Sequence, residues 1–122
     1  MEKYNKVFGG NGERAAEKYL SKKNYKILER NFNVRGGEVD IVAQKGEFTV
    51  FVEVKTRQTT SFGTAAEAVT YTKKQRLIQA ANCYILKHGD CHARFDVIEV
   101  YGEMRGNKFV LFEINHIENA FM

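Results

Sequence analysis

The 122-residue chain has the length of one domain, which could bury roughly two-thirds of the surface of its unfolded chain. Its composition, 43% hydrophobic and 28% charged, excludes a disordered or fibrous protein. A formal net charge of +4 favours a polyanionic partner such as nucleic acid, although many small domains are equally basic without one.

Cysteine usage and hydropathy bear on the cellular compartment. Cys83 and Cys91 form no CxxC motif and are too few for a disulfide framework, which is typical of a reducing cytosol. No apolar run of signal-peptide length lies near the N-terminus, and no stretch approaches the ~20 apolar residues of a membrane span. We therefore expect a cytoplasmic protein that does not enter a membrane.

The N-terminal region predicts an arm followed by a helix. Residues 1–10 end in a glycine pair and predict a flexible arm, after which Asn11 is suited to cap a helix over residues 12–23. The remaining residues 11–122 are predicted to form a single domain.

Glu13 has an unusual position in this predicted helix. At about 100° per residue, it falls within roughly 60° of Ala16 and Leu20, so it leans toward the buried side. An acid in a first turn is also favoured by the helix dipole, so its position alone assigns Glu13 no function.

Alternating patterns predict three strands in the next part of the chain. The first covers residues 26–34, and a glycine turn leads to a second that starts at Glu38. A tight turn at residues 45–47 separates the second strand from the third. Three apolar residues of each strand share one face: Val39, Ile41 and Ala43 in the second, and Val50, Val52 and Val54 in the third.

The turn determines which acids meet across these two strands. If residues 46–47 form the loop, Asp40 lies opposite Glu53, and Glu38 lies opposite Lys55. A loop placed one residue earlier shifts the partners by two but keeps Asp40 and Glu53 on one face. Opposed residues have Cβ atoms about 4.5–5.5 Å apart, close enough for two carboxylates to share a cation.

A solvated polar face is the simpler interpretation of this pattern, with Glu38 and Lys55 as a cross-strand ion pair. However, Val42 and Phe51 lie on the same face, and the opposite face is already apolar. Both faces are therefore expected to be at least partly covered. A covered pair of carboxylates repels and is costly unless a cation or a base neutralises it.

Five segments of the chain resemble those of a known family. Asp40, twelve intervening residues and then Glu53-Val54-Lys55 resemble the D…(D/E)-x-K signature of the PD-(D/E)XK nuclease superfamily. The segments G-E-R-A-A-E-K-Y-L, G-E-V-D-I-V, F-V-E-V-K-T-R, F-G-T-A-A-E-A-V and R-F-D-V-I-E-V are similar to those of the YraN-like family of bacterial proteins, which are regarded as endonucleases. The resemblance extends over about residues 10–115.

This resemblance implies a restriction-endonuclease-like α/β/α core, in which helices flank a central mixed β-sheet, as in the archaeal Holliday-junction resolvases. It implies that Asp40 and Glu53 bind Mg²⁺ or Mn²⁺, with the backbone carbonyl of Val54 as an additional ligand. Lys55 matches the catalytic lysine, and Glu13 matches a further acid of the resolvase-like branch. These residue types suit the chemistry, because hard oxygen ligands hold such cations and an ammonium group can orient water or stabilise developing charge.

The chain departs from the superfamily pattern in one respect. It contains no proline, so Val39 precedes Asp40 where the pattern has proline, and the role of Glu38 stays open. The resemblance also implies DNA as the partner, including branched or structured DNA. Resolvase relatives pair as homodimers to cut two strands, so a homodimer and a monomer both stay open. The alternative is a non-catalytic nucleic-acid-binding module that retains the fold.

The region after the signature predicts a polar loop over residues 56–64 and a helix from about residue 65 or 70 to residue 87. The first turns of that helix carry T-K-K-Q-R. Basic groups at a helix N-terminus are mildly unfavourable, so they either contact phosphate or form an ordinary solvated face. The candidate nucleic-acid-binding residues are Arg57, Lys73, Lys74, Gln75 and Arg76.

Two further strands are predicted over residues 93–101 and 108–115, with a turn over residues 102–107 between them. Asp96 is either a second acid of the site or, with better support, a partner for hydrogen bonds at the start of its strand. The three histidines show no ligand spacing on a helix face, so a zinc site is not expected.

Overall fold

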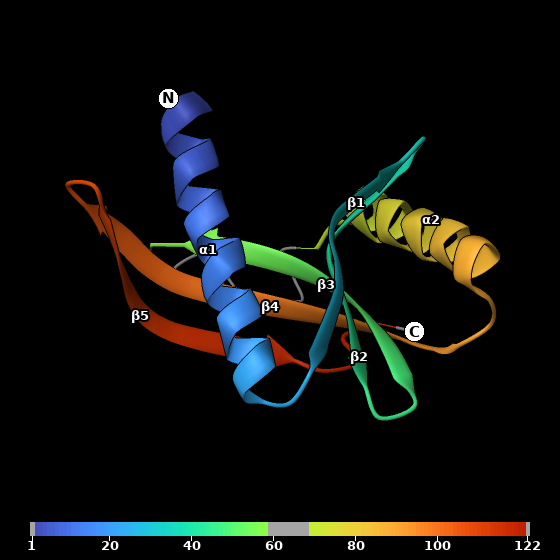
Figure 1. Ribbon diagram of the computed structural model, residues 1–122. Helices are drawn as coiled ribbons and strands as arrows, with labels where there is room; N and C mark the ends of the chain where they lie inside the picture. The colour runs from blue at the N-terminus through green and yellow to red at the C-terminus, as the bar shows by residue number, and fades with distance from the viewer. Residues whose placement is uncertain (1, 59–68, 122) are drawn as a thin grey trace.

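The computed structural model describes residues 2–58 and 69–121 (Figure 1). Its elements are α1 (Glu2–Lys22), β1 (Lys26–Val34), β2 (Gly37–Lys45), β3 (Phe48–Arg57), α2 (Tyr71–His88), β4 (His92–Arg105) and β5 (Lys108–Ile117). The strands form one sheet in the order β1-β2-β3-β4-β5, in which β3 and β4 are parallel and the other neighbours antiparallel. The loop predicted over residues 56–64 was wrong at its start, because β3 continues through Arg57. The rest of that loop from residue 59 onward and the alternative helix start at residue 65 lie outside the described residues.

Two hydrophobic clusters occupy the opposite faces of the sheet, because alternate residues of β3 point in opposite directions. On one face, Ala16 and Leu20 of α1 pack on a cluster that includes Val52. On the other face, α2 packs through Leu77 on a cluster that includes the fully buried Phe51. The mixed sheet with a helix on each face is the α/β architecture that the sequence predicted, and both faces of β3 are covered.

The β2–β3 hairpin has the register expected for a two-residue turn. Gly46 and Glu47 form the turn, with Gly46 at a left-handed φ of 57°, and Lys45 pairs with Phe48. The register from which the sequence predicted that Asp40 and Glu53 lie close together is therefore confirmed.

Val39 departs from the face that the sequence predicted for it. It belongs to the cluster under α2 together with its β1 partner Phe32, whereas Ile41 belongs to the cluster under α1. The prediction that Val39 and Ile41 share a face was therefore wrong. Strict alternation is lost because the pairing of β2 is interrupted at the residue between them, Asp40.

The first helix starts earlier than the sequence predicted. It begins at Glu2, so the residues expected to form an arm continue the helix, and Asn11 is not its cap. Asn11 instead donates through its side chain to the carbonyl four residues earlier, at 2.8 Å. The Phe8 ring packs edge-on against Phe109 of β5, with the centroids 5.9 Å apart. Tertiary packing thus overrides the low helix propensity of the glycines.

Gly12 allows α1 to approach β3 closely. A Cβ atom at this position would lie 1.8 Å from Oγ1 of Thr56, so a larger residue would clash unless Thr56 moved. This close approach holds the next residue, Glu13, beside the sheet.

The C-terminal half has the predicted order of elements with one displaced boundary. Thr70 caps α2 by accepting a backbone N–H at 3.2 Å, and Gly89 ends it. β4 continues through Gly102, where the sequence predicted a turn, and the chain reverses at residues 106–107 instead. Gly102 belongs in the strand because a Cβ atom there would lie 2.5 Å from the carbonyl oxygen of Val110.

Cys83 and Cys91 are free thiols. Within residues 2–58 and 69–121, no helix combines the length and the apolar character needed to cross a membrane.

Candidate active site

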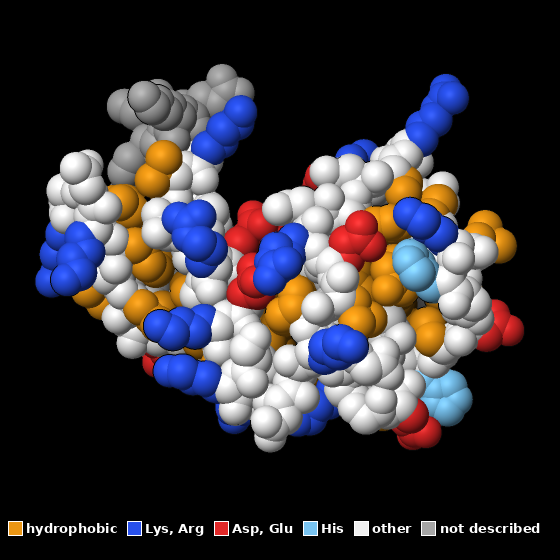
Figure 2. All heavy atoms as spheres, in the orientation of Figure 1, with side chains coloured by type: hydrophobic (Ala, Val, Ile, Leu, Met, Phe, Trp, Pro, Cys, Tyr) orange, Lys and Arg blue, Asp and Glu red, His pale blue; other side chains and the backbone are white. Residues whose placement is uncertain are grey.

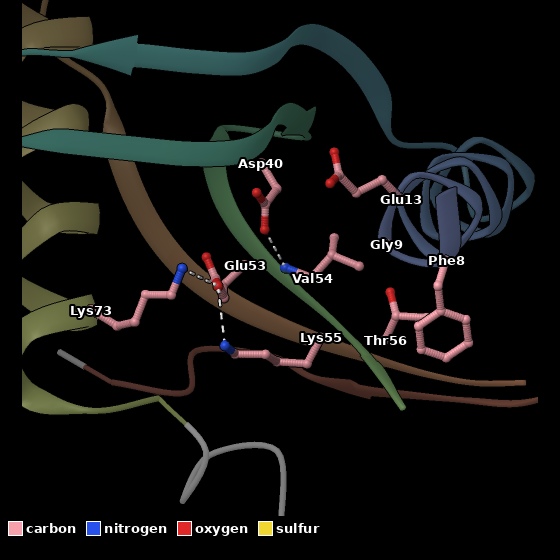
Figure 3. A pocket seen from close by; sticks show the side chains of 9 residues that line it. All are labelled: Phe8, Gly9, Glu13, Asp40, Glu53, Val54, Lys55, Thr56 and Lys73. Atoms are coloured by element: carbon pink, nitrogen blue, oxygen red, sulfur yellow. Dashed lines mark hydrogen bonds and ion pairs between the residues drawn. The ribbon is translucent and has the colours of Figure 1, made fainter. Parts of the chain in front are cut away.

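Asp40 lies where the pairing of β2 is interrupted on both sides. The last pair of the β2–β3 ladder is Ile41 with Val52, so Asp40 and Glu53 are not paired. In the β1–β2 ladder, the residues on either side of Asp40 are paired, but Asp40 and Asn31 are not. Asn31 has a left-handed φ of 49° at this break. The Asp40 carboxylate turns toward β3, where the Val54 N–H donates to its Oδ2 atom at 2.8 Å (Figure 3). Where the two strands separate, the Asp40 carboxylate therefore replaces a backbone carbonyl as the acceptor for the Val54 N–H.

Glu53 is the most deeply buried acid of this region, with 3% of its side chain exposed. Its Oε1 atom lies 3.2 Å from the Lys73 Nζ atom and 3.7 Å from the Lys55 Nζ atom. Its Oε2 atom is buried and has no hydrogen-bond partner among the described residues. A buried carboxylate oxygen without a donor is costly, so this atom points to a cation or ligand that the site accepts.

A third acid, Glu13, reaches the same place from α1. Figure 3 shows its carboxylate directed toward that of Asp40. The three acids line a cleft of about 400 Å³. Figure 2 shows acidic side chains at the bottom of a hollow that is open to solvent, with basic side chains beside them. The other residues lining the cleft are Phe8, Gly9, Val54, Lys55, Thr56 and Lys73.

Burial and mutual repulsion dominate the electrostatics of the cleft. Burial, followed by the charge of Glu53, raises the pKa of Asp40 to about 8, against the opposing effect of the Val54 N–H. Burial and the same neighbour also raise the pKa of Glu13. The cleft thus contains more carboxylate groups than the hydrogen-bond donors of the described residues stabilise.

The donor set fits a hard divalent cation, although the described residues contain no ready-made cluster of three or more His, Cys, Asp or Glu side chains that would hold a metal. Asp40 and Glu53 offer carboxylate oxygens, one of them the unpartnered Oε2 of Glu53. Val54 lines the cleft, with its amide used by Asp40. A cation would offset the charge of Glu53, which, after burial, raises the pKa values of Asp40 and Glu13.

Lys73 lies inside the cleft, where sequence reasoning did not expect it. The sequence predicted that Lys73 contacts phosphate or belongs to a solvated face, but its Nζ atom faces Glu53 and lies 3.4 Å from Oε1 of Glu38. One signal in the sequence could have indicated this position. Lys73 precedes Leu77 by four residues, so it lies on the apolar stripe that packs on the sheet.

The other predicted nucleic-acid-binding residues lie in different places. Arg76 is at the edge of the cleft, with Nε 3.9 Å from Oε1 of Glu38. Gln75 is exposed, and the Lys74 ammonium lies 5.5 Å from the ring centroid of Phe121. These three residues share the first turns of α2.

Arg57, the remaining candidate for nucleic-acid binding, lies at the end of β3 and pairs with an acid of β4. Its Nε atom lies 3.1 Å from Oε2 of the buried Glu99, and 14% of its side chain is exposed. Oε2 of Glu99 and Nη1 of Arg57 have no hydrogen-bond partner among the described residues, so the contact is an ion pair without hydrogen-bond geometry. Glu99 comes from β4, the parallel neighbour of β3.

Asp96 lies outside the cleft, in a separate network. Its carboxylate accepts from Arg94 and from the Asn119 N–H, and its Oδ2 atom lies 2.7 Å from Nε2 of His116. Burial alone would raise the pKa of Asp96, but the hydrogen bonds from His116 and Arg94 lower it. The structure therefore favours a hydrogen-bonded role in the strand over a second acid of the site.

The mixed sheet, the two helices that flank it and the acidic cleft at its split hairpin define a restriction-endonuclease-like α/β core. A model of the uncharacterised protein family UPF0102 matches residues 12–100, which include every acid and lysine of the cleft. The chain belongs to this family, which is the one that the sequence motifs indicated.

Related proteins are similar over their whole length. A UPF0102 protein of Caldanaerobacter subterraneus subsp. tengcongensis is 46% identical over 124 residues, covering 99% of this chain and 100% of the relative. UPF0102 proteins of Clostridium perfringens and Geobacter metallireducens are 45% and 46% identical, each over 99% of this chain and over 98% and 97% of their own lengths.

Proposed function

We propose that the protein is a metal-dependent endonuclease that hydrolyses phosphodiester bonds in DNA. The observation that carries the proposal is the unpartnered Oε2 atom of Glu53, buried beside Asp40 in a solvent-accessible cleft that also holds lysines. The structural ion pair between Arg57 and Glu99 also buries a carboxylate oxygen without a hydrogen bond, but Glu99 does not line the cleft, whereas the unpartnered oxygen of Glu53 belongs to a cleft that a second acid, Asp40, also lines.

In this proposal, Asp40 and Glu53 hold Mg²⁺ or Mn²⁺, with the Val54 carbonyl and Glu13 as additional ligands. When bound, the metal would supply a Lewis acid for the phosphate and a water of lowered pKa. Lys55 follows Glu53 by two residues and so projects from the same face of β3, with 28% of its side chain exposed to the cleft. Its ammonium would orient the attacking water and stabilise negative charge developing on the phosphate oxygens.

The proposed substrate is DNA, including branched or structured DNA, acted on in the cytoplasm by a monomer or a homodimer. The formal net charge of +4 supports a polyanionic partner. Lys74, Gln75 and Arg76 lie on the first turns of α2, and Arg76 lies 3.9 Å from Glu38, a partner of the cleft residue Lys73, so these residues could contact phosphates next to the cut.

The test is nicking of plasmid, flap and four-way-junction DNA in Mg²⁺ or Mn²⁺. Asp40→Asn and Glu53→Gln should each reduce the rate by about 100-fold or more, as expected when a group that stabilises transition-state charge is lost. Glu47→Gln is the matched control, because Glu47 is an acid of the same hairpin with 68% of its side chain exposed. Undiminished nicking by both cleft variants would refute the proposal.

A non-catalytic nucleic-acid-binding module is the second candidate. It is favoured by the absence of a ready-made metal cluster among the described residues. In that case the wild-type protein would bind DNA with an affinity that falls steeply with salt, but would show no metal-dependent turnover on any of these substrates.

A further inference from the structure

The Lys73 ammonium occupies a position in the cleft where a cation is expected. It lies 3.2 Å from Oε1 of Glu53, closer than the Lys55 ammonium at 3.7 Å. Lys73 is therefore a charged counter-ion delivered to the acids by α2, a different element from the one that carries them.

The charges of the cleft favour exchange of this ammonium for a metal over simple addition of a metal. Three carboxylates, Glu13, Asp40 and Glu53, line the cleft with two ammonium groups, those of Lys55 and Lys73. With all three carboxylates ionised, as they would be around a bound metal, the lining carries one net negative charge before the metal is counted. Adding a divalent cation would reverse that charge, whereas replacing Lys73 with the cation would leave the lining neutral.

Glu38 offers Lys73 a second partner at the edge of the cleft. Its Oε1 atom lies 3.4 Å from the Lys73 Nζ atom, and 40% of its side chain is exposed, against 3% for Glu53. The lysine side chain has a flexible four-carbon stem, so its ammonium can leave Glu53 and stay with Glu38 without a movement of the backbone. This contact gives a role to Glu38, whose purpose the sequence pattern left open.

We propose that Lys73 is the internal counter-ion of Glu53 in the metal-free protein, and that a divalent cation displaces it toward Glu38. This inference rests on the proposed metal site. The acids can then stay together in the folded protein without metal, and every metal ion that binds must compete with a tethered ammonium. Lys73 acts on the metal through Glu53 and is a positioning residue.

Calorimetric titration with Mn²⁺ alone, without DNA, tests the competition directly. Lys73→Met keeps the aliphatic stem but removes the charge, so it should bind Mn²⁺ about tenfold more tightly, or better, than the wild type. The same titration of Lys74→Met, which removes an equal charge from the adjacent residue, should stay within about twofold. Lys73→Arg keeps the charge and should stay within about threefold of the wild type.

Glu38→Gln supplies an independent variant should Lys73→Met fold poorly. Removing the second partner holds Lys73 on Glu53, so Mn²⁺ should bind about two- to threefold more weakly than in the wild type. Mn²⁺ affinity that is unchanged or weaker in Lys73→Met, or stronger in Glu38→Gln, would overturn the inference. If neither the wild type nor Lys73→Met binds Mn²⁺, the metal site and the inference both fail. If Lys73→Met binds more tightly but the wild type never nicks DNA, only the proposed function fails.

Discussion

Asp96 in β4 accepts four hydrogen bonds, whereas Asp40 in β2 accepts one backbone N–H among the described residues and faces two other acids. The consequences for protonation are opposite. Its donors lower the pKa of Asp96, while burial and Glu53 raise the pKa of Asp40 to about 8. An acid surrounded by donors stabilises the fold, and an acid surrounded by acids costs stability unless a cation joins it.

The first prediction concerns Asp96, the acid with four hydrogen bonds. Asp96→Ala should lower the free energy of unfolding by about 3–5 kcal/mol, because it leaves Arg94 largely buried without its carboxylate. Urea denaturation measures the change. Glu103→Ala is the control, since it breaks the exposed Arg105–Glu103 pair and should cost less than about 1 kcal/mol. A loss below about 1 kcal/mol for Asp96→Ala would show that the network does not stabilise the fold.

The second prediction concerns Asp40, whose substitution should raise the free energy of unfolding. Asp40→Asn should stabilise the metal-free protein by about 1–3 kcal/mol near pH 8, because the amide removes a repelling charge but keeps an oxygen for the Val54 N–H. The folded-state pKa of Asp40 is about 8, above its unfolded value of ~3.9, so the folded protein retains a proton that the unfolded chain loses. The wild type should therefore lose stability as the pH rises from about 4 to about 8.

Urea denaturation in chelator at pH 5, 7 and 9 would follow the difference between wild type and Asp40→Asn, which should grow with pH. Asp90→Asn changes an exposed acid of the loop after α2 and should show no such growth. Asp96 contributes the opposite dependence, because its lowered pKa means that its contribution is lost as the pH falls below ~3.9. A constant difference between Asp40→Asn and wild type would contradict the proposed repulsion.

Local sequence rules were sufficient for the parts of the site that depend on short-range geometry. A two-residue turn sets the hairpin register, so Asp40 and Glu53 could be placed at adjacent positions by counting alone. Helical periodicity likewise indicated that Glu13 leans inward. The family motifs added the mixed sheet and the flanking helices, which no local rule supplies.

The features that sequence reasoning missed depend on contacts between distant elements. The position of Lys73 requires knowing how α2 docks on β2 and β3, and the pairing of Arg57 requires the parallel register that brings Glu99 of β4 beside β3. The early start of α1 depends on Phe8 packing against Phe109. Glycine signals misled twice, because the Gly9-Gly10 pair lies within α1 and does not end an arm, and Gly102 lies within β4 and does not form a turn.

The smallest predicted effect tests how α1 completes the acidic cluster. Gly12→Ala should lower the free energy of unfolding by about 1 kcal/mol net, since the added Cβ meets Thr56 and its clash exceeds the gain in helix propensity. Gly9→Ala is the matched control in the same helix. A Cβ atom there meets no described atom within 4 Å, so it should stabilise by about 0.5–1 kcal/mol.

Thermal or urea unfolding of the two alanine variants would measure this contrast between Gly12 and Gly9. If Gly12→Ala displaces α1, the variant should also move Glu13 away from Asp40. The pKa of Asp40 should then fall, because the charge of Glu13 contributes to raising it. The pH dependence of stability in Gly12→Ala should then be shallower than in the wild type. Equal stabilisation by both alanines would mean that α1 tolerates a wider separation from β3, and that the third acid is held in the cleft by other contacts.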